Sequence, residues 1–265
     1  MAKLRIGVVP YMNAKPLIYG FEERHEEVDL VYDVPSALPK MFAEGKLDVV
    51  LMPSVHYFRS RNGYKIIPGC SISSNGPVES VKLFVCAPSM EAVKVVALDT
   101  DSLTSCVLTK IILLKRYSLR PKYITLDDKA KVHDKYADAF LIIGDNAIKL
   151  NEKGFHVLDL GLEWKELVGY PFVYAVWVTK SESQLHEVNK FFQEAKESGL
   201  KSLDKIASLE SERLQLEKER CLWYLKEAIK YHLGEQEIRG LESFYRYALE
   251  MGTVYEGIKI EFNEM

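Results

Sequence analysis

The chain has 265 residues, of which 48% are hydrophobic and 28% are charged, and its 35 basic and 38 acidic side chains leave a formal net charge of −3. This apolar fraction is that of a globular protein and excludes an intrinsically disordered chain. The near-neutral charge argues against nucleic-acid binding through a broad basic face. No apolar run approaches the roughly 18–20 residues that span a bilayer, so we expect no membrane insertion.

The first part of the chain alternates short apolar runs with segments of helical pattern. Strands are predicted at residues 4–9, 28–32 and 47–52, and each is followed by a predicted helix, from residues 17, 36 and 53. In the second of these helices, Ser36 is the expected N-cap and Gly45 the expected glycine just beyond the C-terminus. Such alternation predicts right-handed βαβ units and a mostly parallel sheet covered by helices.

A second series of strands and helices follows. The small polar residues 71–77 predict a loop, and apolar spacing predicts a helix over residues 104–117. A turn at residues 144–146 is predicted to lead into another helix. Beyond residue 179, apolar residues recur at helical spacing, so the C-terminal third is predicted to be helical with charged outer faces. The further predicted strands are 64–70, 81–87, 95–98, 122–126, 139–143 and 174–178.

This order of elements predicts an α/β fold of two lobes. The first lobe is expected to comprise residues 1–84 and 174–265, and the second residues 85–173, with two crossing strands between them. A chain that leaves one lobe, builds another and returns encloses a cleft, and open α/β sheets bind ligands beyond the carboxyl ends of their strands. The turns that are candidates for the binding site are 10–16, 53–56, 75–80, 99–105 and 144–146.

The turn 99–105 is rich in hydroxyl groups and leads into a predicted helix. Ser102 or Thr104 can cap this helix, and the free N–H groups at its start, with Ser105 beside them, can receive a carboxylate or a phosphate. The simpler interpretation is that these side chains only cap the helix. The sequence leaves both interpretations open.

The turns after the first and third strands carry further polar candidates. Asn13 and Tyr11 can hydrogen-bond an anion, although Asn13 also fits an Asx turn before a proline. Lys15 supplies a positive charge or is solvated, and Ser54 caps its helix or touches a ligand. His56 has no acidic partner visible in the sequence, and a single histidine of this kind is more often structural than catalytic.

Asp145 directly follows the strand predicted at 139–143. It can act as a general acid or base, and it equally fits the N-cap of the next helix, which is the favoured interpretation. No Ser–His–Asp order, C-x-x-C pair, phosphate-binding loop, dinucleotide motif or secretory signal occurs. We therefore expect the four cysteines to be reduced thiols in the cytoplasm, and we expect a cleft for a small anionic ligand without a metal or cofactor.

Residues 5–17, RIGVVPYMNAKPL, resemble the opening signature of the chorismate dehydratase family, which belongs to the futalosine route to menaquinone. Met12 departs from this signature, in which leucine is usual, and the exchange conserves side-chain volume. Each further motif is weak alone, but their common order along the chain makes the resemblance specific. These motifs are residues 35–38, 45–49, 52–54, 76–80, 101–105, 138–145 and 169–177.

The resemblance implies a two-lobed, periplasmic-binding-protein-like fold of the second type and a cytoplasmic hydro-lyase that needs no cofactor. It implies conversion of chorismate, a dicarboxylate, to 3-[(1-carboxyvinyl)oxy]benzoate with loss of water. On this basis we expect Asn13, Ser80 and Asp145 to be catalytic. The proton is expected to go to a substrate carboxylate, with Asp145 or His56 as the competing base. The residues expected to bind the substrate are Tyr11, Lys15, Ser54, His56, Gly76, Ser102, Thr104, Ser105 and Asn146.

Three alternatives accompany this interpretation. The first is a solute-binding protein of the same fold that holds a small anionic ligand without chemistry. The second is the sister dihydroxynaphthoate synthase, which opens with a different strand-end turn. The third is the ligand-sensing domain of a regulator, although no DNA-binding helix pair flanks the lobes. The chain is expected to act as a monomer or a homodimer.

Overall fold

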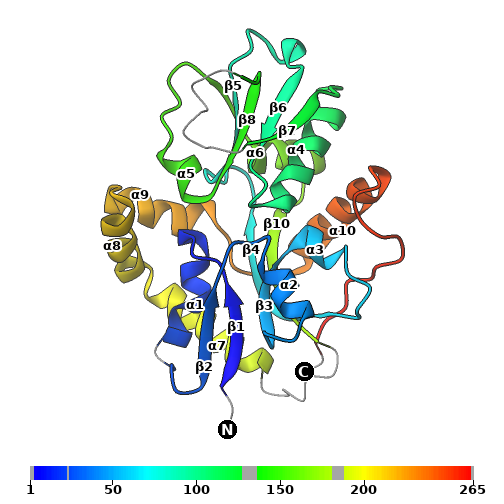
Figure 1. Ribbon diagram of the computed structural model, residues 1–265. Helices are drawn as coiled ribbons and strands as arrows, with labels where there is room; N and C mark the ends of the chain where they lie inside the picture. Colours follow the sequence, from blue (N-terminus) through cyan, green and yellow to red (C-terminus); the bar gives the residue numbers. More distant parts are fainter. Residues whose placement is uncertain (1–2, 23, 127–135, 181–187, 264–265) are drawn as a thin grey trace.

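The computed structural model describes residues 3–22, 24–126, 136–180 and 188–263. Figure 1 shows two lobes, one above the other, each built on a five-stranded sheet with helices against it. The strands β4 (Lys65–Ser74) and β10 (Phe172–Thr179) lie at the waist, where the chain passes between the lobes. The predicted two-lobed α/β architecture is therefore confirmed.

The first sheet joins β1 (Leu4–Val8), β2 (Val28–Tyr32) and β3 (Val49–Pro53) to the two waist strands, in the order β2-β1-β3-β10-β4. β1 runs parallel to β2 and β3, whereas β10 runs antiparallel to β3 and β4. The prediction of a mostly parallel sheet is therefore wrong for half of these pairings. Because β4 leads toward the second lobe and β10 returns from it, β10 must run against its neighbours.

The second sheet comprises β5 (Val81–Val85), β6 (Val95–Leu98), β7 (Lys122–Thr125), β8 (Ala139–Ile143) and β9 (His156–Asp159), in the order β7-β6-β8-β5-β9. β6 is parallel to β7 and β8, and β5 is antiparallel to β8 and β9. All of β5 pairs with β8, so the chain changes sheets before residue 81. The boundary expected after residue 84 falls inside β5, and the one expected before residue 174 falls inside β10.

Helices flank both sheets (Figure 1). The helices that precede β5 or follow β10 in the chain are α1 (Lys15–Glu22), α2 (Leu38–Ala43), α3 (Ser54–Tyr57), α7 (Val188–Lys201), α8 (Leu203–Leu214), α9 (Lys218–Trp223) and α10 (Glu235–Glu250), with the turns η1 (Met12–Ala14) and η4 (Tyr224–Ala228). The helices between β5 and β10 are α4 (Leu103–Lys115), α5 (Gly144–Lys149) and α6 (Leu160–Val168), with the turn η2 (Met90–Ala92). None of the described helices is both long and apolar enough to cross a membrane.

Local signals in the sequence give some helix ends and miss others. Gly45 follows α2 with a φ of +76°, which confirms its predicted place beyond the helix C-terminus. Ser36 is not the N-cap of α2, because the helix begins after Ala37 and has no side-chain cap. The sequence analysis missed α6, whose N-cap is Asp159.

β4 extends to Ser74, through part of the segment 71–77 that composition predicts to be a loop. The buried Ser71 donates a hydrogen bond from its Oγ to the carbonyl oxygen of His232 at 2.7 Å. Serine favours turns because its hydroxyl competes with backbone hydrogen bonds. Here the strand pairs with β10, and the hydroxyl finds a partner in the C-terminal part of the chain, so an extended conformation costs little.

β10 carries much of the aromatic core. Trp177 is fully buried, and its ring lies 4.9 Å from that of Phe192 on α7. At the other end of the strand, the Phe172 ring lies 5.1 Å from that of Trp164 on α6 and 5.2 Å from that of Phe244 on α10. Edge-to-face contacts of this kind contribute roughly 0.5–1.5 kcal/mol each beyond area burial. The strand that returns from the second lobe is thereby fixed in position.

Three of the four cysteines are buried, and Cys86 is half-buried. Burial raises the pKa of the Cys70 thiol to about 11 and that of the Cys106 thiol to about 12. Since the thiolate is the reactive form, these side chains are inert at neutral pH. They pack as small apolar groups.

The crossing of α1 and α7 tests how closely this core is packed. A Cβ added at Gly199 would lie 1.8 Å from the carbonyl oxygen of Pro16. We expect Gly199→Ala to lower the free energy of unfolding by about 1–3 kcal/mol because the helices must separate, although alanine favours an isolated helix by about 1 kcal/mol. Chemical denaturation measures the change, with the exposed Glu197→Ala on the same helix as control. A stabilised Gly199→Ala protein would contradict the close crossing.

Candidate functional site

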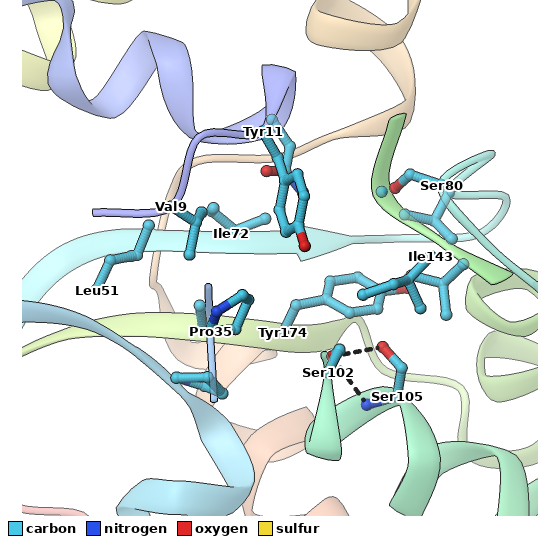
Figure 2. Close-up of a pocket in the computed structure, with 16 residues that line it drawn as sticks. Val9, Tyr11, Pro35, Leu51, Ile72, Ser80, Ser102, Ser105, Ile143 and Tyr174 are labelled. Carbon is cyan, nitrogen blue, oxygen red and sulfur yellow. Dashed lines mark hydrogen bonds between the residues drawn. The ribbon is translucent and has the colours of Figure 1, made fainter. Parts of the chain in front are cut away.

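A pocket lies between the two lobes and is lined mainly by apolar side chains (Figure 2). It holds about 580 Å³ of space, counting the part open to solvent. A few polar side chains in an apolar pocket are typical of sites that orient a small ligand. The lining residues are Val9, Tyr11, Asn13, Pro35, Leu51, Pro53, Ile72, Val78, Ser80, Val81, Ser102, Ser105, Ile143, Gly144, Tyr174 and Ala175.

Both lobes contribute polar groups to this pocket. Tyr11 and Asn13 follow β1, and Tyr174 lies on β10, whereas Ser80 precedes β5 and Ser102 follows β6. Figure 2 shows the two tyrosine rings and the two serine hydroxyls around one space. The strand ends of both sheets therefore converge on a single pocket, as open α/β sheets do.

Ser102, one of the two caps that the sequence allows, caps helix α4. Its Oγ accepts a hydrogen bond from the N–H of Ser105 at 3.3 Å and lies 2.9 Å from Ser105 Oγ (Figure 2). Both residues line the pocket, so the N-terminus of a 13-residue helix faces it. The helix dipole and the hydroxyls make this wall suitable for a carboxylate.

Thr104 does not take part in this wall. It is absent from the pocket lining, and its Oγ1 accepts a hydrogen bond from the N–H of Val55 at 3.2 Å. Val55 belongs to α3 in the first lobe and Thr104 to α4 in the second. The threonine therefore connects the lobes, and ligand binding by Thr104 stays a prediction.

Ser80 is held by a loop that is anchored on Asp159. The carboxylate of Asp159 accepts hydrogen bonds from the N–H groups of Val78 and Glu79 at 3.0 and 2.7 Å and also caps α6. Glu79 has a φ of +63°, a conformation uncommon for such a residue. Burial raises the pKa of Asp159, while its N–H donors lower it. The sequence analysis missed Asp159, whose available signal is an acidic residue just before an apolar helix.

Tyr224, which comes from the turn η4, lies beside Asn13 and is hydrogen-bonded to Ser80. The buried Tyr224 hydroxyl donates a hydrogen bond to Ser80 Oγ at 2.9 Å. Burial raises the pKa of Tyr224 far above its ordinary value, and hydrogen bonds with Ser80 and Asn13 lower it in part. The Oδ1 atom of Asn13 is buried and has no hydrogen-bond partner among the described residues. Sequence reasoning missed Tyr224, which no motif near Asn13 or Ser80 points to.

Tyr174 is a second tyrosine that the sequence analysis did not single out. Its hydroxyl lies 3.1 Å from Ser74 Oγ, and its ring packs edge-to-face on Phe172 at 4.7 Å. Burial raises the pKa of Tyr174 well above its usual value, so the phenol stays protonated. Tyr174 belongs to the motif 169–177, through which the chain resembles the chorismate dehydratase family, and this motif could have pointed to it as a candidate site residue.

Asp145 is occupied in joining the lobes. Its Oδ1 accepts a hydrogen bond from the N–H of Met12 at 3.2 Å, and its Oδ2 accepts one from Arg213 at 2.7 Å. The N-cap of α5 is Ile143, so the favoured interpretation of Asp145 as N-cap is wrong. Its carboxylate does not line the pocket. Asp145 lies in the first turn of α5, where its carboxylate contacts Met12 of η1 and Arg213 of α8.

Five further expected residues lie outside the pocket lining. Ser54 donates its hydroxyl to the carbonyl of Val173 at 2.6 Å, and Lys15 lies 5.5 Å above the Tyr32 ring. The remaining three are Gly76, Asn146 and His56. Gly76 is buried in the loop before Ser80, with a φ of +131°, and Asn146 is exposed on α5. His56 has a buried Nε2 without a hydrogen-bond partner among the described residues.

The chain matches the menaquinone biosynthesis family over residues 4–250. It belongs to this family. A curated relative, the chorismate dehydratase of Thermus thermophilus, is 29% identical over 257 residues, which cover 90% of this chain and 93% of the relative. The family expected from the sequence motifs is thus confirmed, and the match includes every residue that lines the pocket.

Solved structures with little sequence identity share the fold. A protein from Archaeoglobus fulgidus superposes with a TM-score of 0.73 at 18% identity, over 95% of this chain and 98% of that one. The periplasmic aliphatic sulphonate binding protein SsuA from Escherichia coli gives 0.66 at 15% identity, over 98% and 96%. The expected periplasmic-binding-protein-like fold is therefore confirmed. Within the described ranges, no three His, Cys, Asp or Glu side chains are grouped so as to hold a metal ion.

His56 should make stability depend on pH. Burial, and to a lesser extent Arg59, lowers the pKa of His56 from 6.5 to about 4. Below pH 6.5 the unfolded chain takes up this proton and the folded protein does not. The free energy of unfolding should therefore fall by roughly 2–3 kcal/mol more between pH 7 and pH 4 than in His56→Gln. Denaturation of both proteins at the two pH values measures this, and equal pH dependence would show that His56 is solvated when folded.

Proposed function

We propose that this chain is a cytoplasmic chorismate dehydratase that eliminates water from chorismate to give 3-[(1-carboxyvinyl)oxy]benzoate for menaquinone biosynthesis. The observation that carries the proposal is the relative of that name, which aligns with 90% of this chain and so spans both lobes. The pocket supports it independently, because its polar groups suit a small ligand with carboxylate and hydroxyl groups. The proposed reaction uses no cofactor.

The substrate itself supplies the driving force. Chorismate carries two carboxylates, a ring hydroxyl and a C–H bond beside the enolpyruvyl ether. Loss of that proton and of the hydroxyl makes the ring aromatic. The protein then has to position these groups and stabilise the charge that develops as the C–O bond breaks. In our proposal the N-terminus of α4, with Ser102 and Ser105, holds one carboxylate.

The proton goes, in our proposal, to the enolpyruvyl carboxylate of the substrate. The electron pair of the C–H bond becomes a ring double bond, and the ring C–O pair leaves with the hydroxyl. The proton taken up by the carboxylate then passes to this oxygen, so that water is released and the carboxylate is restored. Asn13 and Ser80 orient the reacting groups from the wall that they share. Asp145 is engaged by Arg213 and lies outside the pocket lining. His56 is a weak base at a pKa of about 4 and also lies outside it.

Incubation of the purified protein with chorismate tests the reaction. We expect an aromatic product lighter than chorismate by one water, detected by absorbance and mass spectrometry. Binding of chorismate without turnover would instead support the solute-binding alternative. Turnover of a different substrate and none of chorismate would point to the sister synthase.

Asn13→Ala tests the polar wall. We expect kcat to fall by roughly 10²–10⁴-fold, because the buried Oδ1 is positioned to contact the reacting ligand. Circular dichroism and the unfolding midpoint should stay close to those of the wild type. The matched control is Asn151→Ala, since this asparagine is exposed and absent from the pocket lining and should be dispensable. An unchanged kcat in Asn13→Ala would remove Asn13 from the site.

Asp145→Asn and His56→Gln test the identity of the base. We expect both variants to keep kcat within about one order of magnitude, with a pH–rate profile that retains the wild-type ionisations. Asp145→Asn should mainly weaken the contact between the lobes, because it loses the ion pair with Arg213. A fall in kcat of several orders of magnitude with chorismate binding retained would make the altered residue the base.

A further inference from the structure

Tyr224 lies at an unusual point of the backbone. It begins the π-helical turn η4, in which the N–H of Ile229 donates to the carbonyl oxygen of Tyr224 at 3.1 Å. Such turns occur often at functional sites, because the wider turn displaces a side chain from the helix surface. Here the turn delivers a phenol from the C-terminal third of the chain to the pocket wall that the two lobes share.

The hydrogen bonds around this phenol have a fixed direction. Burial keeps Tyr224 protonated, so its hydroxyl has one proton to give, and that proton goes to Ser80 Oγ at 2.9 Å. Asn13 lies beside this hydroxyl and lowers the pKa of Tyr224 in part. A serine hydroxyl that accepts one hydrogen bond still carries its own proton, and an amide oxygen such as Asn13 Oδ1 is an acceptor.

We propose that Tyr224 is a positioning residue that orients Ser80 as a hydrogen-bond donor toward the ligand, beside the acceptor atom Oδ1 of Asn13. Both residues line the pocket, and Asn13 Oδ1 is buried without a partner among the described residues. The inference rests on the proposed function and refines it. The ligand has to offer an acceptor to Ser80, as a carboxylate or a departing hydroxyl does, and a donor to Asn13, as a ring hydroxyl does.

Tyr224→Phe removes the hydroxyl and keeps the ring. We expect kcat with chorismate to fall by roughly 10–100-fold while KM stays within about threefold, because geometry at the reacting groups is lost and the binding groups at α4 remain. The unfolding midpoint should change little. In a Ser80→Ala protein, Tyr224→Phe should cause no comparable second loss, since the tyrosine acts through the serine.

The matched control is Tyr231→Phe. Tyr231 is also buried, lies seven positions further along the chain, and has a hydroxyl without a hydrogen-bond partner among the described residues. Removal of that hydroxyl should leave kcat unchanged. If Tyr224→Phe turns over chorismate as fast as the wild type, or no slower than Tyr231→Phe, the positioning role is overturned while the proposed function stands.

A second measurement does not depend on turnover. In ¹⁵N-labelled protein, the side-chain amide signal of Asn13, assigned by its loss in Asn13→Ala, should shift in Tyr224→Phe and stay in place in Tyr231→Phe. A signal that is unchanged in Tyr224→Phe would overturn the inference. If the wild type fails to dehydrate chorismate, the proposed function is lost, and this shift still decides whether the Tyr224 hydroxyl lies at the wall formed by Asn13 and Ser80.

Discussion

The antiparallel pairing of β4 with β10 is the constraint on which the rest of the structure depends. One strand leads out of the first sheet and the other returns to it, and they pair from Phe172 opposite Ser74 to Thr179 opposite Lys65. Because the chain can enter and leave the second lobe only along these strands, the strand ends of both sheets meet at the waist. The pocket forms there, and the aromatic contacts of Phe172 and Trp177 hold the returning strand in place.

Polar contacts between the lobes determine which side chains remain for a ligand. Asp145 is occupied by Arg213 and the backbone of Met12, and Thr104 is occupied by the backbone of Val55. These groups stabilise the relative position of the lobes, and neither belongs to the pocket lining. The residues that do face it come from the same turns, one or a few positions away.

The pocket is neutral, although the proposed ligand is a dianion. None of the described residues that line it carries a charged side chain. A net charge of −3 works weakly against an anion. In our proposal, attraction therefore comes from oriented dipoles: the N-terminus of α4, the hydroxyls of Ser102 and Ser105, and the phenols of Tyr11 and Tyr174. Such groups need no reorganisation as charge moves during an elimination.

The sequence by itself determined most of the local elements, the turn at Gly45 and, through ordered motifs, the family, and it limited the cap of α4 to Ser102 or Thr104. These features depend on residues close together in the chain, so periodicity and capping chemistry reveal them. Only the tertiary structure decided the strand directions, the roles of Asp145 and Asp159, and the contact between Tyr224 and Ser80. The physical reason is that a polar side chain takes the partner that folding brings to it, and Tyr224 meets Ser80 across 144 positions of sequence.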